Sequence, residues 1–99
     1  MKNIRILKEA ELELWEAAVF YEEKRKGLGL DFEFEIRRSL LIIQTNPTLW
    51  PKRFFKFRKF IIQKFPFDIW YYIENRFIRI YAIAHQRRQP NYWKSRNIN

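Results

Sequence analysis

The chain has no cysteine, a single histidine (His85) and only two glycines, Gly27 and Gly29. Without cysteine it can form neither disulfide bonds nor a thiolate zinc site, and one histidine makes a transition-metal site built only from protein side chains unexpected. Because both glycines fall in one short segment, the sequence also lacks a glycine-rich loop for binding phosphates. We therefore expect neither a metal nor a cofactor.

Long hydrophobic runs are also missing. No apolar stretch approaches the ~20 residues that span a bilayer, and residues 1–7 lack the apolar stretch and the small-residue cleavage site of a secretory signal. We expect a cytoplasmic protein with no membrane association, which the lack of cysteine fits. The 99 residues can bury one hydrophobic core but not two, so we expect a single domain over residues 1–99.

Acidic residues are scarce in the second half of the chain. Residues 1–50 hold eight basic and nine acidic side chains, whereas residues 51–99 hold twelve basic and only two acidic ones, Asp68 and Glu74. The formal net charge of +9 is therefore concentrated after residue 50. Concentrated positive charge attracts polyanions, which are nucleic acids, acidic protein surfaces or acidic tails.

Hydrophobic periodicity predicts two amphipathic helices in the first half. From about Glu9 to Lys26, apolar residues recur on one helical face, and Gly27 can adopt the left-handed conformation that ends a helix. From about Leu28 to Asn46, apolar residues repeat at helical spacing, and Pro47 ends the pattern. Because only a few residues separate the two segments, we expect an antiparallel αα-hairpin.

After Pro51 the period changes to the two residues of a β-strand. Three segments predict consecutive antiparallel strands, the first interrupted near Lys59, and they are Phe54–Phe65, Phe67–Glu74 and Phe77–His85. The segment Ile4–Leu7 predicts one more short strand. We therefore predict an α+β fold, in which an N-terminal short strand and the αα-hairpin pack on a twisted antiparallel sheet of three to four strands.

Alternation along the last predicted strand indicates which side chains face the helices. Ile78, Ile80, Ala82 and Ala84 share one side, and the two alanines would let a helix approach closely. The other side mixes basic and aromatic residues and can stay partly wet. By the same alternation, Lys56 and Arg58 are expected on one face of their strand.

Two groups of basic residues, both interleaved with aromatic ones, are candidates for binding an anion. The first comprises Lys52, Arg53, Lys56, Arg58, Lys59 and Lys64, and the second comprises Arg79, Arg87, Arg88, Lys94 and Arg96, next to His85, Tyr92 and Trp93. Guanidinium groups bind phosphate oxygens, and aromatic planes stack on unpaired bases. The alternative is structural, since alternating aromatics in a strand usually bury one face and a lone histidine forms no recognisable triad.

Several short stretches carry a family resemblance by their order and spacing. They are Tyr21-Glu22-Glu23, Gly27–Phe32, Ile43–Pro47, Arg58–Phe60, Phe65–Tyr71 and Ile80–Pro90, the last containing the pattern His-x-x-Arg-x-Pro. Over nearly its whole length the sequence resembles the RelE/ParE toxin superfamily, including its plasmid-stabilisation members. The resemblance implies a bacterial toxin with a sheet packed on a helical hairpin and held in check by a tightly bound antitoxin.

The resemblance leaves the mode of toxicity open. ParE-like members block DNA gyrase and are not enzymes, whereas RelE-like members are ribosome-dependent endoribonucleases that cut messenger RNA without a metal. Because His-x-x-Arg-x-Pro is more typical of ParE-like members, we predict a gyrase inhibitor. The alternatives are a ribosome-dependent nuclease and a degenerate, non-toxic member that only binds antitoxin.

The expected partner is a cognate antitoxin that is acidic and partly disordered. Such a segment, folding along the helical hairpin and reaching the sheet edge, would neutralise the positive field and cover exposed apolar area. We therefore expect the toxin to form an oligomer, either with the antitoxin or with itself.

For the nuclease alternative, the resemblance implies a set of catalytic residues that activate a ribose 2′-hydroxyl. They are Arg58 and either Arg87 or Arg88 for the charge on the phosphate, Lys56 as a base or a nearby positive charge, and Tyr92 or His85 as proton donor. The sequence lacks a clear equivalent of the basic, tyrosine-bearing C-terminal helix of the nuclease branch.

Overall fold

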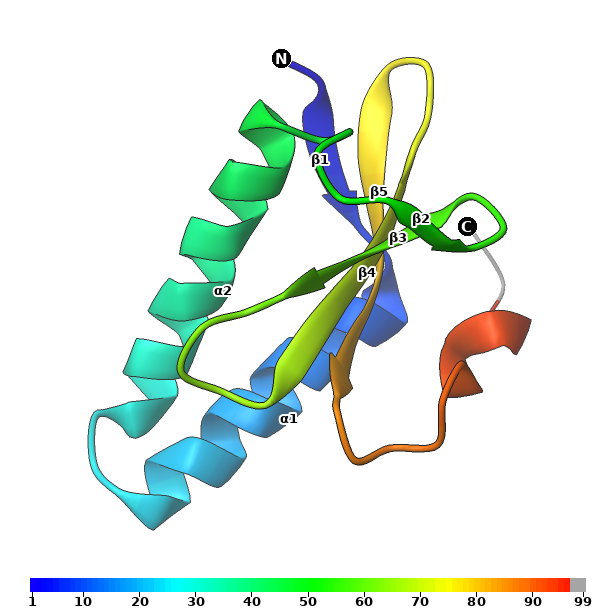
Figure 1. The fold of residues 1–99 in the computed structure, drawn as a ribbon. Helices are drawn as coiled ribbons and strands as arrows, with labels where there is room; N and C mark the ends of the chain where they lie inside the picture. Colours follow the sequence, from blue (N-terminus) through cyan, green and yellow to red (C-terminus); the bar gives the residue numbers. More distant parts are fainter. Residues whose placement is uncertain (97–99) are drawn as a thin grey trace.

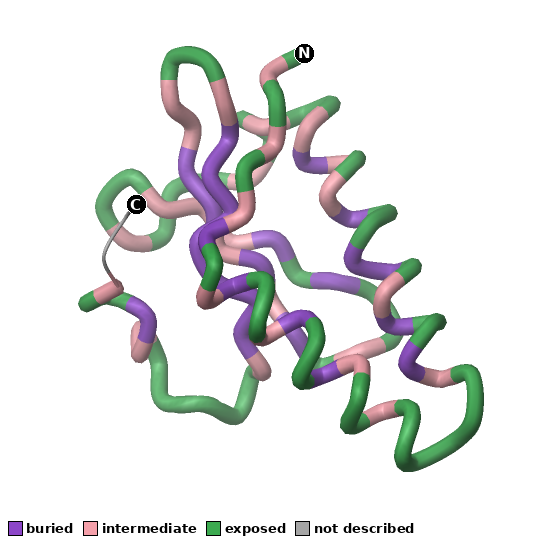
Figure 2. Tube along the Cα trace, turned by 180° about the vertical axis from the view of Figure 1, so that it is seen from behind, coloured by how far each residue is buried: buried purple, intermediate pink, exposed green. Residues whose placement is uncertain are grey.

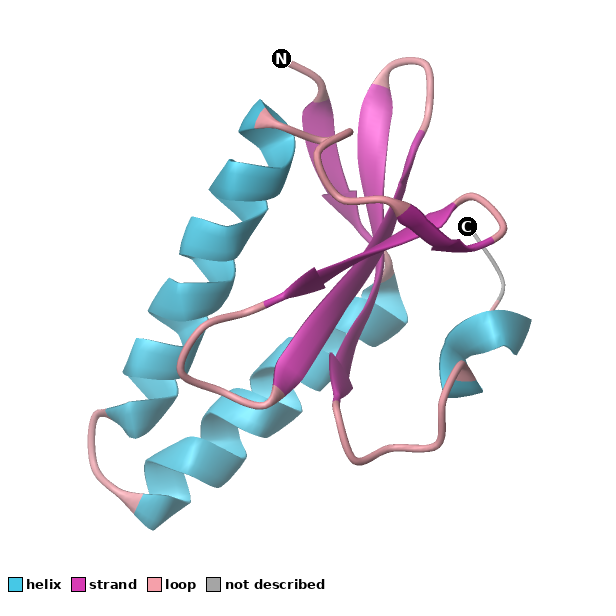
Figure 3. Cartoon of the chain, viewed as in Figure 1, coloured by secondary structure: helices cyan, strands magenta, loops and turns pink. Residues whose placement is uncertain are grey.

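The computed structural model describes residues 1–96. Two helices cover one face of a five-stranded sheet (Figures 1 and 3). The elements are β1 (Asn3–Ile6), α1 (Lys8–Lys24), α2 (Leu28–Thr45), β2 (Lys52–Phe54), β3 (Phe57–Ile61), β4 (Phe67–Ile73), β5 (Phe77–His85) and the 3-10 helix η1 (Tyr92–Ser95). Within residues 1–96, no helix is long and apolar enough to cross a membrane.

The turn between α1 and α2 depends on both glycines. Gly27 has a φ of 88°, in the left-handed region that favours glycine, and its N–H donates to the carboxylate of Glu22 at 3.0 Å. At Gly29 a β-carbon would lie 2.4 Å from the carbonyl oxygen of Ala18, so only glycine lets the helices approach this closely. The predicted αα-hairpin is confirmed, and α2 ends at Thr45, two residues before Pro47.

The sheet is mixed and has the strand order β1-β5-β4-β3-β2. β1 pairs with β5 in parallel, and the other neighbours are antiparallel. The α+β class is confirmed. The N-terminal strand β1 belongs to the sheet and forms one of its edges. The predicted break near Lys59 is wrong: the chain turns at Phe55 and Lys56, where Phe55 has a φ of 51°, and this turn separates β2 from β3.

A β-bulge interrupts the pairing of β4 with β5. Tyr71 pairs with Ile80, but Trp70 pairs with Ala82, so Tyr81 is an extra residue on β5. An extra residue shifts the alternation of all side chains that follow it. Before Tyr81 the even-numbered residues of β5 face the helices, and after Tyr81 the odd-numbered residues do.

The bulge reverses which residues at the end of β5 face the helices. Ile83 lines a cavity together with Ala17 of α1, whereas Ala84 lines a cavity with Trp93 on the other side of the sheet. Ala82 pairs with Trp70, whose ring packs on that of Trp93. The prediction that Ala82 and Ala84 face the helices is therefore wrong. We call the side of the sheet opposite α1 and α2 the open face.

The main core lies between the helical hairpin and the sheet, where Figure 2 shows buried positions on the inner sides of both helices. Phe32, Ile36 and Ile43 of α2 are fully buried, as are Ile69 of β4 and Ile80 of β5. Burying each such side chain stabilises the fold by about 1.5–3 kcal/mol relative to leaving it in water. This core fixes the position of α1 over the end of β5.

A second, aromatic cluster covers part of the open face. Trp93 of η1 is 1% exposed, and its ring lies 4.8 Å from the rings of Phe57 and Trp70 and 5.7 Å from that of Tyr81. Edge-to-face and tilted aromatic contacts of this kind add to the energy of burial. Trp93 thereby fastens the C-terminal segment to the sheet.

Candidate functional site

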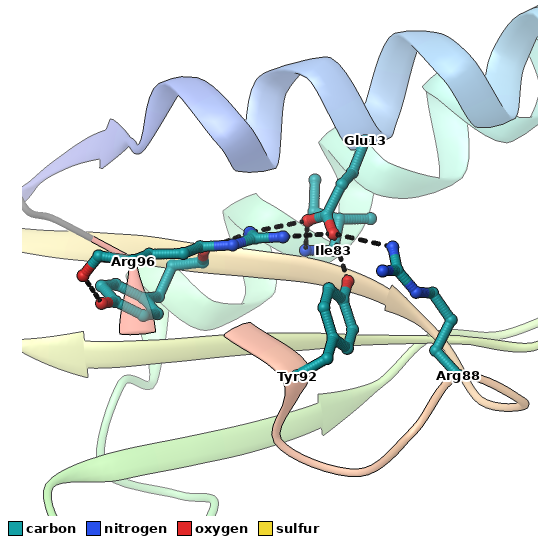
Figure 4. A network of polar contacts seen from close by, with 6 residues as sticks. Glu13, Ile83, Arg88, Tyr92 and Arg96 are labelled. Atoms are coloured by element: carbon teal, nitrogen blue, oxygen red, sulfur yellow. Dashed lines mark hydrogen bonds and ion pairs between the residues drawn. The ribbon is translucent and has the colours of Figure 1, made fainter. Parts of the chain in front are cut away.

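The carboxylate of Glu13 on α1 is the centre of a polar network at the end of β5 (Figure 4). It accepts hydrogen bonds from two nitrogens of Arg96, at 3.0 and 2.6 Å, and from the hydroxyl of Tyr92. It also accepts one from the backbone N–H of Ile83, at 3.0 Å, and forms an ion pair with Arg88 at 3.8 Å. We call these five residues the Glu13 network.

The Glu13 network satisfies an unpaired stretch of sheet edge. β1 pairs with β5 only from Phe77 to Ile80, so within residues 1–96 no strand lies beside this edge of β5 beyond Ile80. Glu13 accepts the N–H of Ile83, and Arg96 donates to the carbonyl oxygen of Tyr81 at 3.0 Å. Side chains thus replace the missing ladder bonds, which buried backbone groups require.

The electrostatics of the network fix the protonation of its members. Burial raises the pKa of Tyr92 well above its ordinary value of 10.0, and the hydrogen bond to Glu13 raises it further. Burial lowers the pKa of Arg96, but its hydrogen bond and ion pair with Glu13 outweigh this, so that the net change is upward. Tyr92 therefore keeps its proton and Arg96 its charge at neutral pH.

His85 lies beside this network at the helix-facing side of the sheet. Its Nδ1 accepts a hydrogen bond from the backbone N–H of Arg87 at 3.0 Å, which places the proton of the neutral ring on Nε2. Its ring packs against Phe67, with the centroids 5.0 Å apart. His85, Arg88 and Tyr92 together line two small cavities of about 180 and 190 Å³.

The two predicted site residues of the first basic cluster lie elsewhere. Arg58 pairs with Tyr71 on the helix-facing side of β3 and donates to the carbonyl oxygen of Trp50 at 2.7 Å. Lys56 lies in the turn before β3, with its Nζ 4.0 Å from the ring centroid of Tyr72 on the open face. The expectation that Lys56 and Arg58 share one strand face is wrong, because Lys56 lies in the turn and only Arg58 belongs to β3, which begins at Phe57.

The structure therefore brings three of the five predicted residues together, His85, Arg88 and Tyr92, and keeps Lys56 and Arg58 apart from them and from each other. The sequence reasoning missed Glu13, which joins the network. A signal for it existed, because Glu13 follows Ala10 by three residues and precedes Ala17 by four, and both alanines are buried.

Basic side chains on the open face stack on aromatic rings. The Nζ of Lys59 lies 5.8 Å from the ring centroid of Trp70, and that of Lys94 lies 4.8 Å from Phe54. Phe55, at the tip of the β2–β3 turn, is 81% exposed. Cations held over aromatic planes form a surface suited to an anionic partner.

Comparison with known proteins identifies the fold. No protein-family model matches the sequence, and no curated protein matches it significantly. One chain of a solved structure entitled "Chromosomal ParDE TA system from P. aeruginosa" superposes with a TM-score of 0.77 at 16% sequence identity. The match covers 86% of this chain and 96% of the other. The predicted RelE/ParE-type fold is thereby confirmed.

Proposed function

We propose that this chain, which has the fold of a chain in a ParDE structure, is the toxin of a bacterial type II toxin–antitoxin pair. We further propose that it inhibits DNA gyrase in the manner of ParE-like toxins and that a cognate antitoxin neutralises it. One observation carries the choice of mechanism: the groups that RNA cleavage would require are bound to other parts of the protein. Arg58 donates to a backbone carbonyl, and Tyr92 donates to Glu13.

These contacts argue for binding rather than catalysis. A general acid works best when its pKa lies near the working pH. Burial raises the pKa of Tyr92 above its ordinary value of 10.0, which moves it further away from neutral pH. Cations that stabilise a developing phosphate charge must point at one position, and Arg58 and Arg88 lie on β3 and after β5, each bound locally.

Exposed apolar side chains on the helical hairpin support the antitoxin partner. They recur at helical spacing on the sides of α1 and α2 that face away from the core, and they are Leu12, Trp15, Val19, Leu30, Phe34 and Leu41, each 44–69% exposed. Apolar stripes of this kind mark surfaces that a partner covers. Because residues 51–99 carry a large positive excess, an antitoxin with acidic residues flanking its apolar anchors would fit both features.

The β2–β3 turn supports a separate contact with the target. Phe55 has a positive φ, which is strained for a bulky residue, its side chain is largely exposed, and the basic residues Arg53 and Lys56 lie close to it in sequence. Strain kept at an exposed position is typical of binding sites. We assign this turn to the contact with gyrase or gyrase-bound DNA.

The test combines growth measurement and transcript mapping in an induced culture with a supercoiling assay on purified components. We expect the chain to arrest growth, to inhibit plasmid supercoiling by purified gyrase and to leave messenger RNA uncut when transcript ends are mapped. Cuts inside transcripts on ribosomes, with supercoiling unaffected, would overturn gyrase inhibition. Neither effect, with the antitoxin still bound, would identify a non-toxic member.

Messenger RNA cleavage is the second candidate, and one observation favours it. His85, Arg88 and Tyr92 line the same two cavities, which places an imidazole, a guanidinium and a phenol within one small region. If the chain is a nuclease, His85→Ala should abolish the cuts in transcripts. If the chain is a gyrase inhibitor, the same variant should still inhibit supercoiling to nearly the same extent.

Antitoxin binding has its own matched pair of variants. Val19→Asp places a charge in the middle of the α1 stripe and should prevent copurification with the product of the adjacent small open reading frame, while toxicity remains. Gln63→Asp makes the same charge change at an exposed position in the loop between β3 and β4 and should leave copurification intact. Equal binding by both variants would contradict the hairpin as the docking surface.

A further inference from the structure

Arg79, in the first half of β5, is a buried cation that has no acidic partner among residues 1–96. It is 9% exposed, and its Nε has no hydrogen-bond partner within residues 1–96. None of the ion pairs in this part of the chain includes it. Its guanidinium carbon lies 5.0 Å from the ring centroid of Phe77, and the guanidinium carbon of Arg5 lies 4.6 Å from the same centroid. Burial raises the pKa of Tyr72, and a hydrogen bond with Arg79 partly offsets this rise, so the guanidinium has a neutral partner on β4. A buried charge is normally balanced by an opposite charge, and no ion pair supplies one within residues 1–96, so this arrangement indicates a missing anion.

The N-terminus of α1 lies at the same place in the fold. α1 begins at Lys8, directly after β1, and its N-cap residue Leu7 makes no side-chain hydrogen bond to the first turn. The free N–H groups of a first helical turn and the helix dipole attract negative charge. An uncapped helix N-terminus alone is not a site, but here it adjoins a buried cation.

A cavity of about 410 Å³ connects these two features. It is lined by Ile6, Leu7 and Lys8 at the junction of β1 and α1, by Arg79 from β5 and by Glu11 from the first turns of α1. The cavity thus combines a helix N-terminus, an ammonium group and a buried guanidinium with a single carboxylate. It lies at the opposite end of β5 from the Glu13 network.

We propose that this cavity binds a phosphate group that keeps one proton, either as free phosphate or as the terminal phosphate of a monoester. The guanidinium of Arg79, the ammonium of Lys8 and the N–H groups of α1 bind the charged oxygens. The carboxylate of Glu11 accepts a hydrogen bond from the protonated oxygen.

Glu11 gives this site its selectivity. A phosphate monoester keeps one proton below its second pKa, near ~6. Sulfate and the phosphodiesters of a nucleic-acid backbone have no such proton at neutral pH, so that the carboxylate would repel them. The site therefore discriminates between anions, whereas the other basic residues of the open face would bind any polyanion, and it does not depend on the proposed toxin activity.

The experiment is isothermal titration calorimetry of the purified chain at a pH of about 5 and low salt, where monoesters are largely monoprotonated. The probes are inorganic phosphate, a nucleoside 5′-monophosphate, sulfate and a dinucleoside phosphodiester. We expect inorganic phosphate and the nucleotide to bind at least about tenfold more tightly than sulfate and the phosphodiester. The protonated phosphates gain a charge-assisted hydrogen bond to Glu11, whereas sulfate and the phosphodiester are repelled by its carboxylate. Tighter binding of the nucleotide identifies a nucleotide as the source, and equal binding identifies free phosphate.

Three variants test the residues, and one serves as control. Arg79→Gln should weaken phosphate binding about tenfold or more, and Glu11→Gln should bring sulfate and phosphate to within about threefold of each other. Lys8 is exposed, so Lys8→Ala should fold even if Arg79→Gln does not. Lys8→Ala should weaken phosphate binding several-fold. Lys26→Ala removes an equal charge from the turn between α1 and α2 and should have no effect. Equal binding of phosphate and sulfate to the native chain, or equal losses from Lys8→Ala and Lys26→Ala, would overturn the proposal.

Discussion

Two largely buried arginines, one in β5 and one packed against it, differ in how their charge is balanced. Arg96 binds Glu13 through two nitrogens and donates to the carbonyl oxygen of Tyr81, whereas Nε of Arg79 has no partner in residues 1–96. Both positions remove a cation from water, which is costly unless an anion compensates. The difference indicates that the Glu13 network serves the fold and that Arg79 serves a ligand.

The same difference separates the two ends of β5. At its start the strand pairs with β1, so its backbone is satisfied and the nearby side chains are free for other roles. At its end no strand of the described part of the chain lies on that side, and Glu13 and Arg96 form hydrogen bonds with the backbone of Ile83 and Tyr81 instead. Charged side chains that complete the sheet are not available for chemistry.

The largest effect is expected from Glu13→Ala. It leaves the guanidinium of Arg96, the hydroxyl of Tyr92 and the N–H of Ile83 without their acceptor, and we expect a loss of about 3–5 kcal/mol in the free energy of unfolding. Urea unfolding followed by circular dichroism measures it. Glu16→Ala, at an exposed position three residues further along α1, is the control and should change stability by less than about 0.5 kcal/mol. Similar small losses from both would show that the network does not hold the C-terminal segment.

The two arginines should respond oppositely to the same replacement. Arg96→Met leaves the carboxylate of Glu13 buried with fewer donors, and we expect a loss of about 2–3 kcal/mol. Arg79→Met replaces a buried cation that has no ion pair within residues 1–96 with an apolar side chain of similar length, so that we expect no loss or a small gain. Thermal and urea unfolding of both variants in phosphate-free buffer make the comparison. A loss of the same size from both would remove the distinction between them.

Alkaline pH provides a smaller effect, on the helix-facing side of the sheet. Tyr71 is fully buried, its hydroxyl donates to the carbonyl oxygen of Pro47 at 2.8 Å, and burial raises its pKa to about 12. A raised pKa means that the fold favours the protonated form, so this contribution is complete below the ordinary value of 10.0 and is lost as the pH rises toward 12. The shift corresponds to about 2–3 kcal/mol.

Tyr71→Phe isolates this contribution from the titration of other groups. The variant lacks the ionisable hydroxyl, so its stability should fall less steeply than that of the native chain between pH 10 and 12. Urea unfolding at intervals of half a pH unit compares the two. Parallel curves would show that Tyr71 does not titrate with the fold.

The smallest effect on stability is expected from Phe55→Ala. The side chain is 81% exposed, so the free energy of unfolding should change by less than about 0.5 kcal/mol. Growth arrest, in contrast, should weaken if the β2–β3 turn contacts the target. Leu49→Ala, at a position 68% exposed, is the control and should leave growth arrest unchanged. Full toxicity of Phe55→Ala would exclude the turn from target binding.

Local signals in the sequence were sufficient for the helical hairpin and for most strands. Gly27 and Pro47 mark the ends of α1 and α2 because each restricts the backbone by itself. The face of β5 was not predictable in the same way. The bulge at Tyr81 arises from pairing with β4, and nothing in the alternation of β5 alone reveals it.

The candidate site was predictable only in part, because charge alone does not reveal pairing. His85, Arg88 and Tyr92 stand close in sequence and do meet, but their shared partner Glu13 comes from the other half of the chain. Arg79 looked like one more member of a basic cluster. Its burial and its missing partner follow from the parallel pairing of β1 with β5, which brings the start of α1 beside it.

The most direct test of this account is an NMR titration that observes the Nε–H resonances of Arg79 and Arg96 as inorganic phosphate is added. Neither group needs to be mutated, so the comparison is made inside one folded molecule. We predict that the Arg79 resonance and the backbone amides of the first turn of α1 shift with saturation, while the Arg96 resonance stays in place because Glu13 already holds it. Shifts at Arg96 with none at Arg79 would contradict the account.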